Sequence, residues 1–143
     1  MALASQELSE QAALSMLAKN AADVMIIDLR GLSSITEYFV IGTASSEPQI
    51  KAVVEQVTED LKERQTTPWH TEGKQSWRWV LVDYVDVVIH IFRAEVRSFY
   101  GLERLWGDAP RITVSTDLET GDIIRGNDAG VALKEVDDIE REV

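Results

Sequence analysis

Apolar residues recur with a helical period between Ser46 and Arg64, and this is the clearest pattern in the chain. The stripe follows the spacing i, i+3, i+4, i+7 and i+11 and consists of Ile50, Val53, Val54, Val57 and Leu61. Ser46 and Gln49 have the spacing of a capping box, and Pro48 stands in the first turn, where no backbone amide is required. The pattern predicts an amphipathic helix that serves as core scaffolding.

Two further helices are expected on the same grounds. The first covers residues 5–21, with Ser5 as its N-cap. Its broad apolar face consists of Leu8, Ala12, Leu14, Leu17, Ala18 and Ala21. The second runs from Ala94 to about Leu105 and ends before the turn-like residues 107–110.

Short apolar runs bounded by turn residues predict four strands, over residues 24–29, 37–42, 77–83 and 86–92. The last two form a hairpin, and we interpret Tyr84 and Val85 as its two-residue loop. Since side chains alternate between faces, counting outward from the loop assigns the pairs. One face then holds Val80 opposite Ile89 and Val82 opposite Val87, with Ile91 beside Arg78. The other face holds Trp77 opposite Phe92, Trp79 opposite His90 and Leu81 opposite Val88.

The order α-β-β-α-β-β-α predicts an α+β sandwich, in which helices pack on a small mixed sheet. Residues 111–143 differ in character from the rest of the chain. They contain short apolar runs at 112–114 and 123–124, and they close on the charged sequence KEVDDIEREV. We expect residues 1–110 to form the domain and residues 111–143 to be an acidic extension, with an added hairpin or a loosely attached arm and then a frayed or disordered end.

The predicted hairpin carries apolar side chains on both faces. Its aliphatic face is the natural one to pack on helices, whereas its aromatic face needs a separate explanation. One interpretation is that another molecule covers the aromatic face, which makes it a docking surface. The alternative is that the first helix or the C-terminal segment covers it.

Composition narrows the class of protein. The chain has 143 residues, no cysteine and a net charge of −11. The charge argues against a direct grip on a phosphate backbone and favours a basic protein partner, although simple solubility explains it equally well. No apolar run approaches eighteen residues, and the N-terminal MALASQELSE fits neither a secretory nor a transit peptide. We therefore expect a cytoplasmic protein that has no membrane contact.

No motif commits the chain to catalysis. Residues 42–46 lie between a strand and a helix start, but they lack the Gly-Lys-Ser/Thr ending of a phosphate-binding loop. A nucleotidyltransferase would need an Asp-x-Asp pair about ten residues later, and that stretch is helical here. His70 and His90 have no acidic ligands at metal spacing, and Asp83 and Asp86 are interpreted as solvated turn residues. We predict no enzyme activity, metal or cofactor.

Three segments resemble the signatures of the ribosomal silencing factor family, the Iojap-related proteins. The first is DLRGLSSIT at residues 28–36, followed by YFVIGT at 38–43. The second is WVLVDY at 79–84, followed by DVVIHIF at 86–92. The third consists of Arg97, Tyr100 and LERLW at 102–106. Together they cover roughly residues 5–110. Val85 stands where the family's tight turn usually has glycine, and a β-branched residue tolerates positive φ poorly.

The resemblance implies a domain that is topologically similar to a nucleotidyltransferase core but lacks its catalytic carboxylates. Family members bind the intersubunit face of the large ribosomal subunit through its fourteenth protein. They block joining of the small subunit and so repress translation when nutrients are short. Organelle members act in large-subunit assembly, and many members are homodimers off the ribosome. The alternatives for this chain are an assembly factor, a degenerate nucleotide-binding protein, or a dimerisation module that uses its aromatic face.

On this view we expect partner contacts from the hairpin and from the helix that follows it. The apolar contacts are Trp79, Leu81, His90, Phe92, Tyr100, Leu105 and Trp106. Asp83, Glu95 and Glu103 would pair with basic residues of the partner, while Arg97 could pair internally with one of these acids. The alternative for Tyr100, Leu105 and Trp106 is the core face of the last helix. Asp28 and Arg30 are expected to stabilise a turn.

Overall fold

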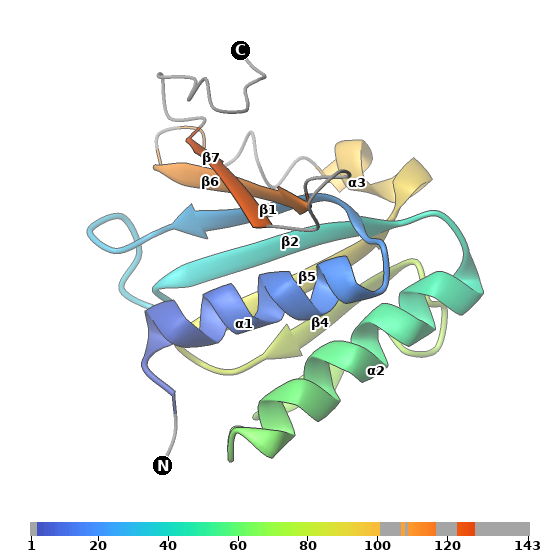
Figure 1. Cartoon of the computed structure of the whole chain (residues 1–143), viewed down its shortest axis with the longest axis horizontal. Helices are drawn as coiled ribbons and strands as arrows, with labels where there is room; N and C mark the ends of the chain where they lie inside the picture. Colours follow the sequence, from blue (N-terminus) through green and yellow to red (C-terminus); the bar gives the residue numbers. More distant parts are fainter. Residues whose placement is uncertain (1–2, 101–106, 108, 117–122, 128–143) are drawn as a thin grey trace.

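A computed structural model describes residues 3–100, 107, 109–116 and 123–127 of the chain. These residues form a seven-stranded mixed sheet with the order β3-β4-β5-β2-β1-β6-β7 (Figure 1). The strands are β1 (Ala22–Asp28), β2 (Tyr38–Ala44), β3 (His70–Glu72), β4 (Trp79–Asp83), β5 (Val87–Arg93), β6 (Arg111–Thr116) and β7 (Ile123–Asn127). β2 and β5 run parallel, and the other neighbouring pairs are antiparallel. The predicted α+β class and mixed sheet are confirmed, but the sheet is larger than expected.

Two helices, α1 (Ser5–Ala18) and α2 (Glu47–Glu63), lie side by side over one face of the sheet (Figure 1). The predicted α2 is confirmed together with its cap, because the Ser46 hydroxyl accepts a hydrogen bond from the Gln49 amide at 3.2 Å. The return arm of the capping box differs from the prediction. The Gln49 side chain accepts a hydrogen bond from the Ser45 amide, one residue earlier than expected.

The first helix was predicted three residues too long and with the wrong cap. It ends at Ala18, and its N-cap is Ala4, which makes no side-chain hydrogen bond. The Ser5 hydroxyl instead donates to the Glu37 carboxylate. Its buried face is made by Leu8, Ser9, Ala12, Ala13, Ser15 and Met16, so the helix is rotated relative to the predicted stripe. A third helix, α3 (Ala94–Tyr100), follows β5, and the rest of the predicted 94–105 helix lies outside the described residues.

The register predicted for the hairpin is wrong by two residues. The observed pairs are Trp79 with Phe92, Val80 with Ile91, Leu81 with His90, Val82 with Ile89 and Asp83 with Val88. The cause is the loop, which consists of Val85 and Asp86, one residue later than predicted, with the flanking Tyr84 amide donating to the Val87 carbonyl at 2.9 Å. Val85 has φ +74°, and the Asp86 amide donates to the Tyr84 carbonyl at 2.9 Å, as in a γ-turn. Because the shift is even, the face predicted for each paired residue is still correct.

Trp77 does not belong to the aromatic face. Its φ of +57° lies outside the strand region, and β4 begins two residues later. The Trp77 ring packs against the main core instead, with the Lys51 ammonium 5.3 Å from the ring centroid. The predicted pair of Trp77 and Phe92 is therefore wrong.

Three strands extend the sheet beyond the four that were predicted for it. β3 falls between the helix predicted to end near Arg64 and the strand predicted over residues 77–83, and it pairs with β4. β6 and β7 form the predicted C-terminal hairpin, and β6 pairs with the edge of β1. The hairpin thus continues the sheet of residues 22–93. The sequence division at residue 110 stays a prediction.

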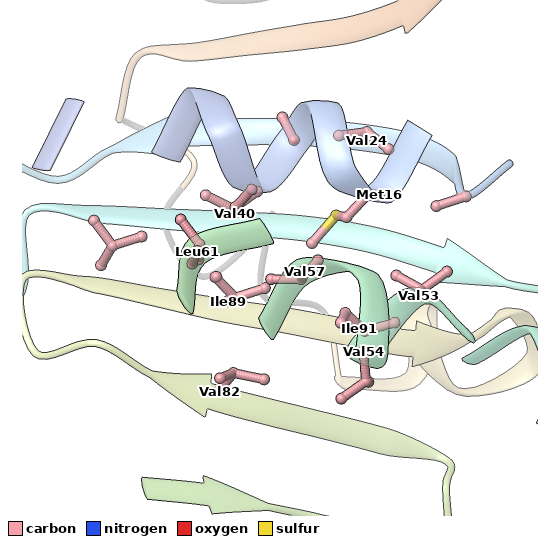
Figure 2. Packing of buried hydrophobic residues seen from close by; sticks show 14 of the residues in the cluster. Met16, Val24, Val40, Val53, Val54, Val57, Leu61, Val82, Ile89 and Ile91 are labelled. Atoms are coloured by element: carbon pink, nitrogen blue, oxygen red, sulfur yellow. The ribbon is translucent and has the colours of Figure 1, made fainter. Parts of the chain in front are cut away.

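The main core lies between the sheet and the two long helices (Figure 2). Val53, Val57 and Leu61 of α2 and Met16 of α1 point toward Val40, Ile89 and Ile91 of the central strands, and all seven are fully buried. Glycine is required at position 42, since a Cβ there would lie 2.6 Å from the Met16 sulfur. Among the described residues, no helix is both long and apolar enough to cross a membrane.

Candidate partner-binding surface

The sheet face turned away from α1 and α2 has its own, smaller apolar cluster, which we call the far face. Ile27, Ile41 and Phe92 are fully buried there, beneath Val96 of α3 and Ala109. Toward β4 the covering becomes incomplete. Phe39, Trp79, Leu81 and Val88 are half-buried on this face. The far face is therefore closed in part and open in part.

Strand pairing brings the aromatic side chains of the far face together. The Trp79 ring stacks on Phe92, with 5.0 Å between ring centroids and 24° between ring planes. The Phe39 ring meets His90 edge-on at 4.5 Å. The Trp79 indole Nε1 donates a hydrogen bond to His90 Nδ1 at 3.1 Å. Four rings from three strands thus form one layer, with the Trp79 and Phe39 rings half-buried.

His90 is held neutral by its surroundings. Its side chain is 3% exposed, and burial lowers the pKa of its imidazole to about 3. Its neighbours across the two adjacent strands are Leu81 and Ile41, neither of which ionises. At neutral pH the ring therefore carries one proton. Because Nδ1 accepts from the indole, that proton lies on Nε2.

The apolar residues predicted to contact a partner divide into three groups. Trp79 and Leu81 are half-buried and can be reached from the solvent. His90 and Phe92 are buried beneath the surface, so in this structure they support the face rather than present it. The Tyr100 side chain, Leu105 and Trp106 lie outside the described residues. Contact between any of them and a partner stays a prediction.

The predicted acidic contacts already have partners within the chain. The Asp83 carboxylate accepts a hydrogen bond from the Val85 amide at 2.7 Å and lies 3.7 Å from His70 Nδ1. Glu95 is exposed, and its carboxylate lies 3.3 Å from the Arg93 guanidinium. Glu103 is outside the described residues. Asp83 thus stabilises the turn of the hairpin, whatever else it contacts.

Two basic side chains have internal roles that the sequence partly anticipated. Arg97 is buried, and its guanidinium donates to the Asp23 carbonyl and to the Thr43 hydroxyl. The internal location is as predicted, and the pairing of Arg97 with an acidic side chain stays a prediction. Arg30 donates from its guanidinium to both oxygens of Asp28, which confirms the predicted turn-stabilising pair. This contact lowers the pKa of Asp28.

Sequence reasoning missed the contribution of β2 to the far face. Phe39 lies beside Val88 because β2 pairs with β5 in parallel. The alternation in EYFVIG indicates that Phe39 and Tyr38 point in opposite directions. Nothing in the sequence pairs that strand with the hairpin, which lies about forty residues further along the chain.

The strand-to-helix turn at residues 42–46 uses its polar groups internally. Gly42 packs on Met16, Thr43 accepts from Arg97, and both serines contact Gln49. Within the described residues, no three His, Asp or Glu side chains are grouped to hold a metal ion. The described part of the chain therefore offers an apolar surface more readily than a chemical site.

Comparisons with known proteins agree on one family. A family profile described as "Ribosomal silencing factor during starvation" matches residues 2–138. The chain is 36% identical over 110 residues to "Ribosomal silencing factor RsfS" of Halalkalibacterium halodurans, covering 77% of this chain and 94% of that one. It is 35% identical over 91 residues to mouse "Mitochondrial assembly of ribosomal large subunit protein 1", covering 62% of this chain and 40% of that one.

The fold is shared with a solved structure from the same group of relatives. A crystal structure of a Chromobacterium violaceum protein matches with a TM-score of 0.71 at 34% sequence identity. The match covers 73% of this chain and 88% of that chain. The open mixed sheet described above is thus similar to one found by experiment.

Proposed function

The chain belongs to the ribosomal silencing factor family, and we propose that it represses translation by binding the large ribosomal subunit on its intersubunit face. A bound body of 16.0 kDa on that face blocks joining of the small subunit by occupying the space. The strength of the block is set by affinity and by the concentration of the protein relative to ribosomes. This function needs no chemistry, and we propose that the protein is not an enzyme.

The far face is the observation that supports this proposal most directly. A face that only had to complete the fold would be covered by the chain itself, as the opposite face is by α1 and α2. Here Trp79, Leu81, Phe39 and Val88 are left half-buried side by side on adjacent strands. Partly exposed aromatic and aliphatic side chains of this kind commonly supply the binding energy of protein interfaces.

The partner we propose is the fourteenth protein of the large subunit. The net charge of −11 favours encounter with a basic ribosomal protein and disfavours direct contact with the phosphates of ribosomal RNA. Asp83 and Glu95 keep exposed or half-exposed carboxylates close to the far face, and each can take a further basic partner. Off the ribosome we propose a homodimer in the cytoplasm.

A role in large-subunit assembly is the second candidate. The mouse relative is named for that process in mitochondria. Both functions use the same contact with the large subunit and differ in whether subunit joining is inhibited. Likeness to a nucleotidyltransferase core stays a prediction, and the engaged groups of residues 42–46 make nucleotide binding the weakest candidate.

Sedimentation with isolated subunits separates these functions. The purified protein is expected to migrate with large subunits but not with small ones, and to reduce the yield of joined ribosomes as its concentration rises. Binding without any effect on joining would favour assembly. Failure to bind either subunit would exclude both ribosomal proposals.

A matched pair of variants tests whether the far face makes the contact. Leu81→Glu puts a charge on the half-buried far face, and Leu32→Glu puts the same charge on the exposed loop between β1 and β2. The first should lower affinity for the large subunit by at least tenfold, and the second should change it little. Thermal unfolding of both variants checks that the fold is intact. Equal affinities would place the contact elsewhere on the molecule.

A further inference from the structure

His90 is an unfavourable residue for its position in the far face. It is 3% exposed among the rings of Phe39, Trp79 and Phe92, and its Nε2 has no hydrogen-bond partner among the described residues. Burying an unpaired polar group costs free energy, whereas a leucine or phenylalanine there would cost nothing of this kind. What histidine provides in return is a single acceptor, Nδ1.

That acceptor is used by the Trp79 indole. The 3.1 Å hydrogen bond joins it to Nε1–H, the only hydrogen-bond donor that a tryptophan side chain has. The same indole is stacked on Phe92, so its plane and its N–H direction are both fixed before any partner arrives. Trp79 is thus oriented from beneath by two buried side chains.

We propose that His90 is a positioning residue that keeps the Trp79 N–H inside the protein, so that the exposed part of the ring meets the partner through carbon atoms only. This inference rests on the proposed function, since it describes the surface offered to the large subunit. The partner group against Trp79 is then an aliphatic side chain, or the flat face or alkyl stem of an arginine. It is not a hydrogen-bond acceptor such as a carbonyl, a carboxylate or a phosphate.

His90 thereby has a role that its burial alone would not reveal. A fixed indole loses less conformational freedom on binding than a mobile one, so part of the ordering cost is met during folding. An inward-pointing N–H also removes the penalty that a partner would incur by covering an unpaired donor. Affinity and partner choice therefore both depend on a side chain that the partner does not touch.

Nuclear magnetic resonance of the free, nitrogen-15-labelled protein tests the geometry without any ribosome. The Trp79 indole signal is assigned as the one that Trp79→Phe removes. We expect slow solvent exchange of this N–H, scalar coupling across the hydrogen bond to His90 Nδ1, and an Nε2-protonated imidazole. A rapidly exchanging indole with no coupling, or a proton on Nδ1, would overturn the proposal.

Two substitutions separate the acceptor from the bulk of the side chain. His90→Leu removes the acceptor. His90→Asn keeps one, because the amide oxygen Oδ1 takes the position of Nδ1. Affinity for isolated large subunits should fall by roughly three- to tenfold in the leucine variant and recover in the asparagine variant. His70→Asn, the same change at the other histidine, should leave the Trp79 indole signal unchanged.

The outcomes distinguish this inference from the proposed function. If wild type fails to bind large subunits, the proposed function fails, and the resonance data still decide whether His90 holds the indole. If wild type binds and His90→Leu, folded by its spectrum, binds equally well, the positioning role is wrong. If His90→Leu does not fold, His90→Asn and the wild-type coupling still decide the question.

Discussion

The two faces of the sheet are both apolar, yet they are built differently. The helix-covered face is mainly aliphatic and is closed over the central strands, with Val40, Val80, Ile89 and Ile91 fully buried beneath α1 and α2. The far face is aromatic and half open, and it contains a buried histidine bonded to a tryptophan. A face that is covered by the chain's own helices requires only side chains that fill the space between sheet and helices. A surface that binds another molecule, as we propose for the far face, must also fix the orientation of its side chains, and the hydrogen bond between Trp79 and His90 would do so.

The largest expected effect comes from neighbouring residues that point to opposite faces. Ile89→Ala, on the closed face, should lower the free energy of unfolding by about 2–5 kcal/mol. Val88→Ala, half-buried on the far face, should cost about 1 kcal/mol or less and should weaken binding to the large subunit. Urea denaturation measures the loss of stability in each variant, and sedimentation measures binding to the large subunit. Equal losses of stability would mean that the far face is as much a part of the core as the other.

Removing the half-buried Trp79 ring is the next test. Trp79→Ala should reduce affinity for the large subunit by about 2 kcal/mol, or roughly thirtyfold, because a desolvated aromatic contact is lost. Trp69→Ala serves as the matched control, since that ring is 72% exposed and lies outside the aromatic layer. Similar losses of affinity in both variants would indicate a contact surface different from the far face.

Acid should act on the far face through His90. Burial lowers the pKa of its imidazole from an ordinary value of 6.5 to about 3. Between these values the unfolded chain binds a proton that the folded protein does not, so stability falls as the pH falls. From about pH 7.5 to about pH 5.5 the loss should be on the order of 1 kcal/mol in wild type. It should be smaller in His90→Asn, which lacks the buried imidazole. Identical pH slopes would contradict burial of a neutral His90.

The smallest predicted effect concerns the helix that closes the other face. Ser46→Ala removes the hydroxyl that accepts the Gln49 amide, and should lower the free energy of unfolding by about 1 kcal/mol. Affinity for the large subunit should not change, because α2 lies on the opposite side of the sheet. A clear loss of affinity would show that the two faces are not independent.

The alternation of side chains was the most reliable guide to the sheet. It assigned Val80 and Val82 to one face and Trp79 and Leu81 to the other, and it survived an error of two residues in the register. The error arose at Val85, because nothing in the residue type predicts the positive φ that it adopts. The face on which a side chain lies follows from the alternation of the strand backbone, whereas the pairing register follows from the geometry of the turn.

What the sequence could not supply was the contact between distant strands. β3 has no apolar pattern, and it exists because the edge of β4 offers it hydrogen bonds. The burial of His90 depends on Phe39, which reaches it through the parallel pairing of β2 and β5. The sequence predicts a partner contact at His90, whereas this strand pairing places the side chain beneath the surface.

The parallel pairing of β2 and β5 also determines when a newly made chain can act. β5 reaches β2 only after α2, β3 and β4 have been synthesised, and such distant pairings form late during folding. Both faces include side chains from β5, so the closed core and the proposed binding surface are expected to form in the same step. If the far face binds as proposed, an incomplete or half-folded chain is expected to lack that surface and so not to compete with finished molecules for the ribosome.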